Sequence, residues 1–130
     1  MHWVVPARLA AGPYPRDVDE LRALGIDAFV DLTEAGELPA YVVDAVEHRR
    51  VPIHDFGTPS IDEMEAILAT LDELLARGRV VYLHCRGGIG RTATVFGCYL
   101  VRQGWSAEDA LASISGPETE AQRAFVRAWR

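Results

Sequence analysis

Several features that define large classes of proteins are scarce or absent in this chain of 130 residues. Two cysteines, Cys85 and Cys98, are too few for a disulfide framework, and no pair of Cys or His residues has zinc-site spacing. No apolar run approaches the roughly 18 residues that a membrane span needs, and the N-terminus has no signal-peptide pattern. Repeats and low-complexity tracts are also absent. We therefore expect one domain over residues 1–130, cytoplasmic and not associated with a membrane.

Positive charge is scarce as well. The formal net charge is −6, from 13 Lys and Arg residues against 19 Asp and Glu residues. Because nucleic acids and acidic membrane surfaces favour basic proteins, neither is an expected partner. An anionic ligand would need a local positive site.

Helix and strand patterns alternate along the chain, with single Pro and Gly residues between them. The clearest helix begins after Ser60, where Glu63 completes a capping box and apolar residues recur at helical spacing as far as Gly78. The apolar run "RVVYLH", Arg79–His84, is typical of a strand buried on both faces. Further helices are predicted over 17–25, 92–104, 106–115 and 118–129, and further strands over 26–32 and 51–54. This order predicts an α/β fold, with a central, mostly parallel sheet of about four to five strands flanked by helices.

The stretch "LHCRGGIGRT", Leu83–Thr92, joins a predicted strand to a predicted helix. Its three glycines let the backbone curl with several N–H groups pointing inward, and the following helix adds its positive N-terminal end. Such a loop binds a tetrahedral anion. The expected phosphate-binding residues are Arg86, Gly87, Gly88, Ile89, Gly90 and Arg91.

Cys85 at the entrance of this loop lies in the same positive field, which favours thiolate over thiol and predicts a nucleophile at neutral pH. Arg91 closes the loop with a planar guanidinium that can hold two phosphoryl oxygens. Thr92 offers a hydroxyl to stabilise the departing sulfur, and His84 can fix the loop by bonding to nearby backbone. A shorter motif, such as a cysteine and an arginine separated by five residues, would be explained equally well by a glycine-rich turn whose buried cysteine has no catalytic role. The full string His-Cys-x-x-Gly-x-Gly-Arg-Thr favours catalysis.

This string resembles the signature loop of cysteine-dependent protein tyrosine phosphatases, most closely that of their small dual-specificity branch. The segments "LAAGPYP", "DFGTPS" and "GPETEAQ" are similar to segments of those enzymes in the same order, so the resemblance covers most of the chain. It implies a phosphatase-like fold and a phosphomonoester hydrolase that works without metal or cofactor through a cysteinyl-phosphate intermediate.

A thiolate that attacks phosphorus must expel a poor leaving group, which needs a proton from an acid. Asp55, thirty residues before Cys85 in the "HDFGTPS" loop, lies where the resembled family keeps its general acid. The resemblance also implies that Glu118 and Gln122 help to place the hydrolytic water, although both residues equally suit a surface helix. By this resemblance, protein phosphotyrosine is the favoured substrate class. The expected partner is a phosphorylated protein or a small phosphomonoester, bound by a monomer.

Other functions stay open from the residues alone. Enzymes acting on phosphoinositides or inositol phosphates use related loops, but these usually carry several basic residues, whereas only Arg86 lies between Cys85 and Arg91 here. Sulfur transfer is disfavoured by the Gly-Arg-Thr ending and by the upstream acid. A module that binds phosphate without turnover is disfavoured because no group needed for turnover is missing. Cys98 is expected to pack in the core, far from Cys85.

Overall fold

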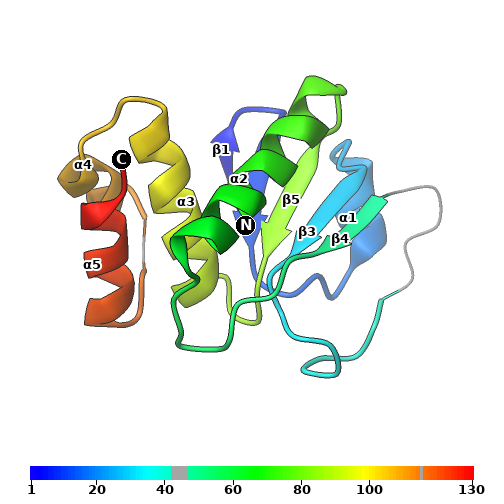
Figure 1. Ribbon diagram of the computed structural model, residues 1–130. Helices are drawn as coiled ribbons and strands as arrows, with labels where there is room; N and C mark the ends of the chain where they lie inside the picture. The colour runs from blue at the N-terminus through cyan, green and yellow to red at the C-terminus, as the bar shows by residue number, and fades with distance from the viewer. Residues whose placement is uncertain (42–46, 115) are drawn as a thin grey trace.

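The computed structural model describes residues 1–41, 47–114 and 116–130. Its centre is a five-stranded sheet with the strand order β1-β2-β5-β3-β4 (Figure 1). The strands are β1 (His2–Val5), β2 (Leu9–Gly12), β3 (Ala28–Asp31), β4 (Glu47–Arg50) and β5 (Val81–His84). β1 pairs with β2 in antiparallel orientation, and the other neighbours pair in parallel. The predicted α/β class and the mostly parallel sheet are confirmed.

Helices cover both faces of this sheet, as predicted (Figure 1). The short helix α1 (Val18–Ala23) lies on one face. The opposite face carries α2 (Ile61–Ala76) and α3 (Gly90–Arg102), and α4 (Ala107–Ala112) and α5 (Glu120–Ala128) pack against α3. Packing against the sheet, α2, α4 and α5 therefore fixes the position of α3 and of the loop that precedes it.

The two faces of β5 enter two separate cores because side chains alternate along a strand. Tyr82 packs with Leu21 and Phe29 in the smaller core beneath α1. Val81 and Leu83 point the other way, into the larger core that α2 and α3 cover. The fully buried members contributed by those helices include Met64, Ile67, Leu68, Leu71, Val95 and Cys98. Burial raises the pKa of the Cys98 thiol to about 12, as expected of a cysteine that only fills space.

Helix α2 has the capping box that its sequence predicts. The Ser60 hydroxyl accepts a hydrogen bond from the Glu63 N–H at 3.1 Å, and the Glu63 carboxylate accepts one from the Ser60 N–H at 2.8 Å. These bonds satisfy two backbone donors that a helix start otherwise leaves without partners. The helix that follows the "HDFGTPS" loop, which we call the acid loop, therefore begins at a defined residue.

Replacing Ser60 with alanine is expected to lower the free energy of unfolding by about 1 kcal/mol, because the Glu63 N–H loses its acceptor. Urea denaturation of the two proteins measures this difference. Ser60→Asp keeps an acceptor at the N-cap and should retain most of the stability. Equal losses in Ser60→Ala and Ser60→Asp would contradict the capping role.

One strand prediction is wrong, and three of the strands were missed. The strand predicted over 51–54 is wrong, because β4 ends at Arg50. β4 lies at the sheet edge and consists of the charged stretch "EHRR", so no apolar run marks it. The next residues still follow β3, with N–H groups of Val51 and Ile53 donating to carbonyls there, but Pro52 has no N–H to continue the ladder. The hairpin of β1 and β2 was not predicted.

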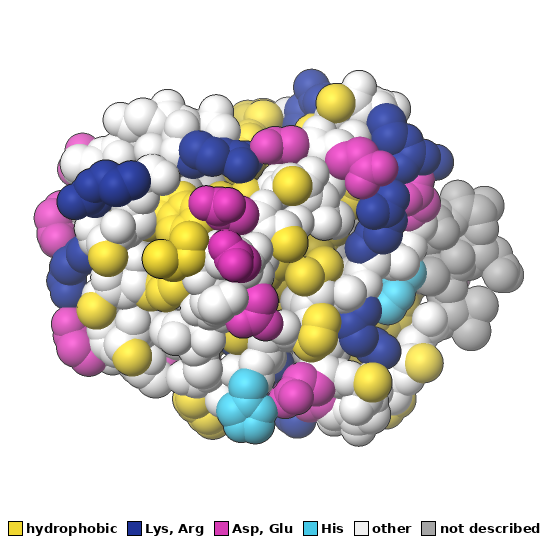
Figure 2. All heavy atoms as spheres, viewed as in Figure 1, with side chains coloured by type: hydrophobic (Ala, Val, Ile, Leu, Met, Phe, Trp, Pro, Cys, Tyr) yellow, Lys and Arg dark blue, Asp and Glu magenta, His cyan; other side chains and the backbone are white. Residues whose placement is uncertain are grey.

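The face seen in Figure 2 combines mixed charge with an apolar region. Acidic and basic side chains are interspersed on the face seen in Figure 2. Apolar side chains gather between α5 and the start of α2, where Ile61, Phe125, Ala128 and Trp129 line a hollow. Within the described ranges, no helix combines the length and the apolar character of a membrane span.

Candidate active site

The signature loop lies at the carboxyl edge of the parallel strands. Cys85 directly follows β5, and α3 begins at Gly90. β5 has β2 on one side and β3 on the other, so the segments that follow those strands also reach this edge. Cys85 and Arg91 are 3% and 2% exposed, which places both ends of the loop inside the protein.

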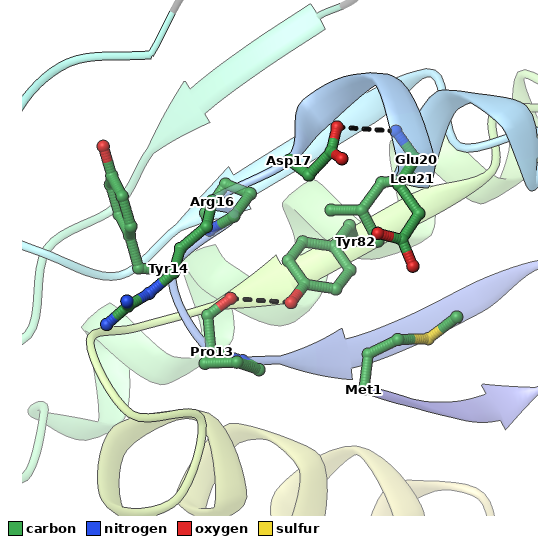
Figure 3. A pocket seen from close by; sticks show the side chains of 9 residues that line it. Met1, Pro13, Tyr14, Arg16, Asp17, Glu20, Leu21 and Tyr82 are labelled. Atoms are coloured by element: carbon green, nitrogen blue, oxygen red, sulfur yellow. Dashed lines mark hydrogen bonds between the residues drawn. The ribbon is translucent and has the colours of Figure 1, made fainter.

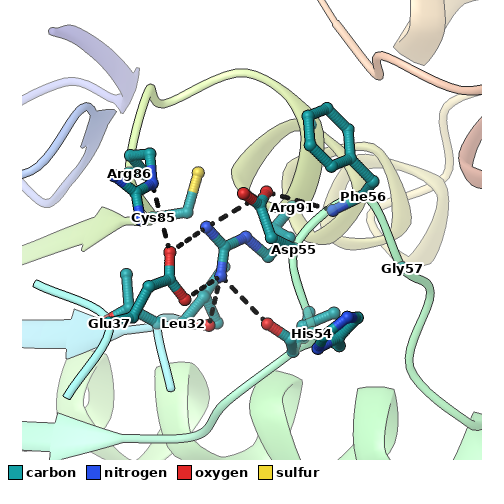
Figure 4. Close-up of polar contacts among 12 residues, drawn as sticks. Leu32, Glu37, His54, Asp55, Phe56, Gly57, Cys85, Arg86 and Arg91 are labelled. Carbon is teal, nitrogen blue, oxygen red and sulfur yellow. Dashed lines mark hydrogen bonds and ion pairs between the residues drawn. The ribbon is translucent and has the colours of Figure 1, made fainter. Parts of the chain in front are cut away.

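Three sequence-predicted residues, Cys85, Arg91 and Asp55, lie together at this edge (Figure 4). Asp55 Oδ1 is 3.3 Å from Nη2 of Arg91. The Asp55 side chain is 35% exposed, so its carboxyl group borders both the guanidinium and solvent. Asp55 Oδ1 also accepts a hydrogen bond from the N–H of Phe56, whose φ of +62° is the left-handed conformation of a tight turn. The acid loop thus turns sharply just after Asp55.

Glu37, which the sequence analysis did not single out, holds the Arg91 guanidinium. Arg91 donates two parallel hydrogen bonds to the Glu37 carboxylate, of 2.8 Å from Nη1 and 2.7 Å from Nη2 (Figure 4). Nη1 also donates to the Ile53 carbonyl at 3.0 Å. The hydrogen bonds from Arg91 lower the pKa of Glu37 to about 2. Burial alone would lower the pKa of Arg91, but the bonds to Glu37 raise it above its usual value.

His84 fixes the backbone at the nucleophile. Its Nδ1 lies 3.1 Å from the Cys85 carbonyl oxygen, and its Nε2 lies 2.6 Å from the Tyr41 hydroxyl. Burial lowers the pKa of His84, which favours the neutral ring. In that ring the carbonyl requires a proton on Nδ1, so Nε2 accepts from Tyr41. The hydrogen bond from His84 thereby fixes the orientation of the Cys85 carbonyl group.

The "LAAGPYP" segment packs against the signature loop. A Cβ atom at Gly88 would lie 2.5 Å from the carbonyl carbon of Gly12, so only glycine allows this approach. The N–H of Tyr14 donates to the Arg86 carbonyl at 3.0 Å. The Tyr82 hydroxyl donates to the Pro13 carbonyl at 2.6 Å, in the wall of a pocket beside α1 (Figure 3). Strand β5 and the segment after β2 therefore brace the loop together.

The remaining predicted residues lie at the start of α3 and beside it. Ile89, at the α3 N-cap, is partly exposed, and Arg86 is half exposed with its Nε 3.5 Å from Glu37. Glu118 accepts a hydrogen bond from the Gly90 N–H at 3.2 Å. Among the described residues, the buried Oγ1 of Thr92 and Nε of Arg91 have no hydrogen-bond partner. Buried groups of this kind are suited to a polar ligand at the loop.

A family model described as the phosphatase domain of Swiss Army Knife proteins, of the dual-specificity and tyrosine phosphatase type, matches residues 1–130. The chain belongs to this phosphatase family. This membership agrees with the resemblance that the signature loop carries.

Two relatives of this chain are named for different phosphatase activities. The chain is 32% identical over 98 residues to phosphatidylglycerophosphate phosphatase PTPMT2 of Arabidopsis thaliana, and the match covers 72% of this chain and 43% of that protein. The chain is also 39% identical over 97 residues to a putative tyrosine phosphatase of Invertebrate iridescent virus 3, and this match covers 68% of this chain and 40% of that protein. The chain spans less than half the length of each of these relatives. A solved structure of a mutant form of Tk-PTP matches with a TM-score of 0.81 and 32% identity, covering 95% of this chain and 89% of that one.

Replacing Glu37 with glutamine is expected to lower kcat/KM for an aryl phosphate by roughly tenfold to a hundredfold. The amide can accept only one of the two bonds that orient Arg91, and it removes the charge that faces the guanidinium. Steady-state hydrolysis of p-nitrophenyl phosphate measures the loss.

Glu34→Gln is the matched control for this change. Glu34 lies on the same loop but is exposed, and its carboxylate pairs with His54 instead of Arg91. We expect this variant to keep nearly full kcat/KM. If Glu37→Gln and Glu34→Gln behave alike, Glu37 does not orient Arg91 for catalysis.

Proposed function

We propose that this protein hydrolyses phosphomonoesters through a cysteinyl-phosphate intermediate, without a metal ion, with phosphotyrosine in proteins as its substrate class. The observation that carries the proposal is the convergence of Asp55 on Arg91, 3.3 Å apart, beside the loop that begins with Cys85. These residues combine an anion site, a nucleophile and an acid. Asp55 and Cys85 are thirty residues apart in the sequence. A glycine-rich turn without a catalytic role would not need an acidic residue from a distant segment beside it.

In the first step, the Cys85 thiolate forms an S–P bond while the bond from phosphorus to the leaving oxygen breaks. Asp55 gives its proton to that oxygen, so the product departs as a neutral alcohol or phenol. Arg91 and the loop N–H groups that precede Gly90 stabilise the charge on the phosphoryl oxygens, while the Gly90 N–H donates to Glu118. The Nε of Arg91 has no hydrogen-bond partner among the described residues, so it can donate to a phosphoryl oxygen.

In the second step, Asp55 as carboxylate takes a proton from water, whose oxygen attacks phosphorus as the S–P bond breaks. The sulfur departs as a thiolate, and the Thr92 hydroxyl can donate a hydrogen bond to it. The burial of this hydroxyl without a partner among the described residues supports that role. The cycle ends with inorganic phosphate, the original thiolate and a protonated Asp55.

The acidic and apolar side chains around the loop favour a substrate that has a single phosphate group attached to an aromatic ring. Glu37 pairs with Arg91 and lies 3.5 Å from Arg86, so the two loop arginines face acidic neighbours. Such surroundings are poorly suited to a highly phosphorylated inositol. Phe56, next to Asp55, is 60% exposed, and Ile89 in the loop is 38% exposed. These side chains offer apolar contact to a phenyl ring.

A substrate panel tests this proposal. We expect the highest kcat/KM with phosphotyrosine peptides, and lower values with phosphoserine and phosphothreonine peptides and with inositol phosphates. Phosphatidylglycerophosphate belongs in the panel because a relative is named for its hydrolysis. A clear preference for that lipid or for inositol phosphates would refute the protein substrate class. Absence of phosphate release from every member would refute the hydrolase itself.

A further inference from the structure

A fully buried amide connects the acid loop to α5. Gln122 is 0% exposed, and its Nε2 donates to the carbonyl of Gly57 at 3.1 Å. Its Oε1 accepts from the N–H groups of Glu118 and Thr119 at 2.9 and 3.2 Å. An amide has one oxygen acceptor and two N–H donors, so these partners determine which way the group faces. Gly57 lies two residues after Asp55.

We propose that Gln122 is a positioning residue that holds the Asp55 loop over the phosphate site, a role that rests on the proposed hydrolase function. It acts through the Gly57 carbonyl, and among the described residues its side chain makes no hydrogen bond to Cys85 or Asp55. The turn between these residues is tight, since the Gly57 N–H donates back to the His54 carbonyl at 2.8 Å. Fixing Gly57 therefore restricts the position of Asp55.

Substrate binding makes this contact more important. Asp55 is also tied to the site by its ion pair with Nη2 of Arg91. A bound phosphoryl group needs the same guanidinium, and its negative charge repels an Asp55 carboxylate there. The ion pair is thus weakened at the stage when the acid must be in place. The bond from Gln122 to Gly57 involves neither charge, so it persists.

The helix that carries Gln122 is itself packed against α3, the helix that carries Arg91. Thr119 caps α5 by accepting from the Gln122 N–H at 3.1 Å. Val126, one turn further along, packs so tightly on Gly97 of α3 that a Cβ there would lie 3.0 Å from its methyl groups. α3 also carries Arg91. Acid loop, α5 and the phosphate-binding arginine consequently form one connected unit.

Hydrogen exchange tests the contact without any turnover. In Gln122→Met, which keeps the length but loses both amide groups, we expect the N–H groups of Phe56 and Gly57 to exchange about tenfold faster. Thr119→Ala is the matched control, since it loses a hydrogen bond of α5 but keeps the Gln122 side chain. It should leave those two rates unchanged. Unchanged exchange in Gln122→Met would overturn the proposal whether or not the protein is a hydrolase.

A leaving-group series tests the consequence for catalysis. For Gln122→Met we expect kcat/KM to fall about tenfold with an alkyl phosphate but less than about threefold with p-nitrophenyl phosphate, whose leaving group needs little protonation. Gln122→Glu, which keeps acceptors for Glu118 and Thr119 but loses the donor to Gly57, should show the same trend. Thr119→Ala should keep the wild-type trend.

Two results would contradict this role. A uniform loss across the series would mean that Gln122 only stabilises the fold. A loss confined to kcat, with a larger burst of released phenol, would place Gln122 in the hydrolysis of the intermediate, as water placement requires. An inactive wild-type protein would instead refute the proposed function, and the exchange rates would still decide the contact.

Discussion

Replacing Cys85 with serine is expected to abolish steady-state hydrolysis of p-nitrophenyl phosphate, with a loss on the order of 10⁴-fold or more. A serine hydroxyl stays protonated at neutral pH and is a far weaker nucleophile than a thiolate. The rest of the site should persist, because His84 holds the backbone at this position and Glu37 holds Arg91. Binding of inorganic phosphate, measured by calorimetry, should therefore survive in Cys85→Ser.

The second cysteine provides the control. Cys98 lies in the core on α3, so Cys98→Ala should lose stability but retain kcat/KM. Rapid acid quenching of the wild-type protein during turnover should trap phosphate on the peptide that contains Cys85. Full activity in Cys85→Ser, or phosphate trapped elsewhere, would exclude the cysteinyl-phosphate mechanism.

The parts of the site that could be predicted from the sequence are those with local causes. The signature loop is one short segment in which glycines, cysteine and arginine have fixed spacing, so its position between β5 and α3 follows from the residues alone. The start of α2 is equally local, because Ser60 and Glu63 cap the helix within one turn. Such patterns placed the helices α1 to α5 and the strands β3 and β5, whereas β4 depends on pairing with β3 at the sheet edge.

Glu37 shows what local reasoning misses. Glu34 and Glu37 are chemically alike and three residues apart, and their segment gives no sign of which one reaches Arg91. The choice comes from a turn in which the Glu37 N–H donates to the Glu34 carbonyl and Gly36 adopts a φ of +82°. This turn sends Glu37 inward and leaves Glu34 exposed with His54. The available signal was topological: parallel strands β3 and β5 end at one edge, so an acidic residue after β3 lies near the arginine.

Asp55→Asn is expected to lower kcat/KM by roughly 10²- to 10⁴-fold for substrates with poor leaving groups, such as alkyl phosphates or phosphotyrosine peptides. Asparagine keeps the size of the side chain but has no proton to give to the leaving oxygen. For an activated aryl phosphate the loss should be less than about tenfold, because its phenolate departs without protonation. The ratio of the two losses therefore reports acid catalysis separately from damage to the fold.

The structure offers a close control for this change. Asp62, in the first turn of α2, is an exposed carboxylate outside the ion pairs of Arg91, so Asp62→Asn should change neither rate. Asp55→Asn also removes a negative charge 3.3 Å from Nη2 of Arg91, which by itself should strengthen the binding of inorganic phosphate. Tighter phosphate binding together with a selective loss on poor leaving groups distinguishes an acid from a residue that only orients Arg91. Equal losses on both substrate types would remove Asp55 from proton transfer and leave its contact with the guanidinium as its only role.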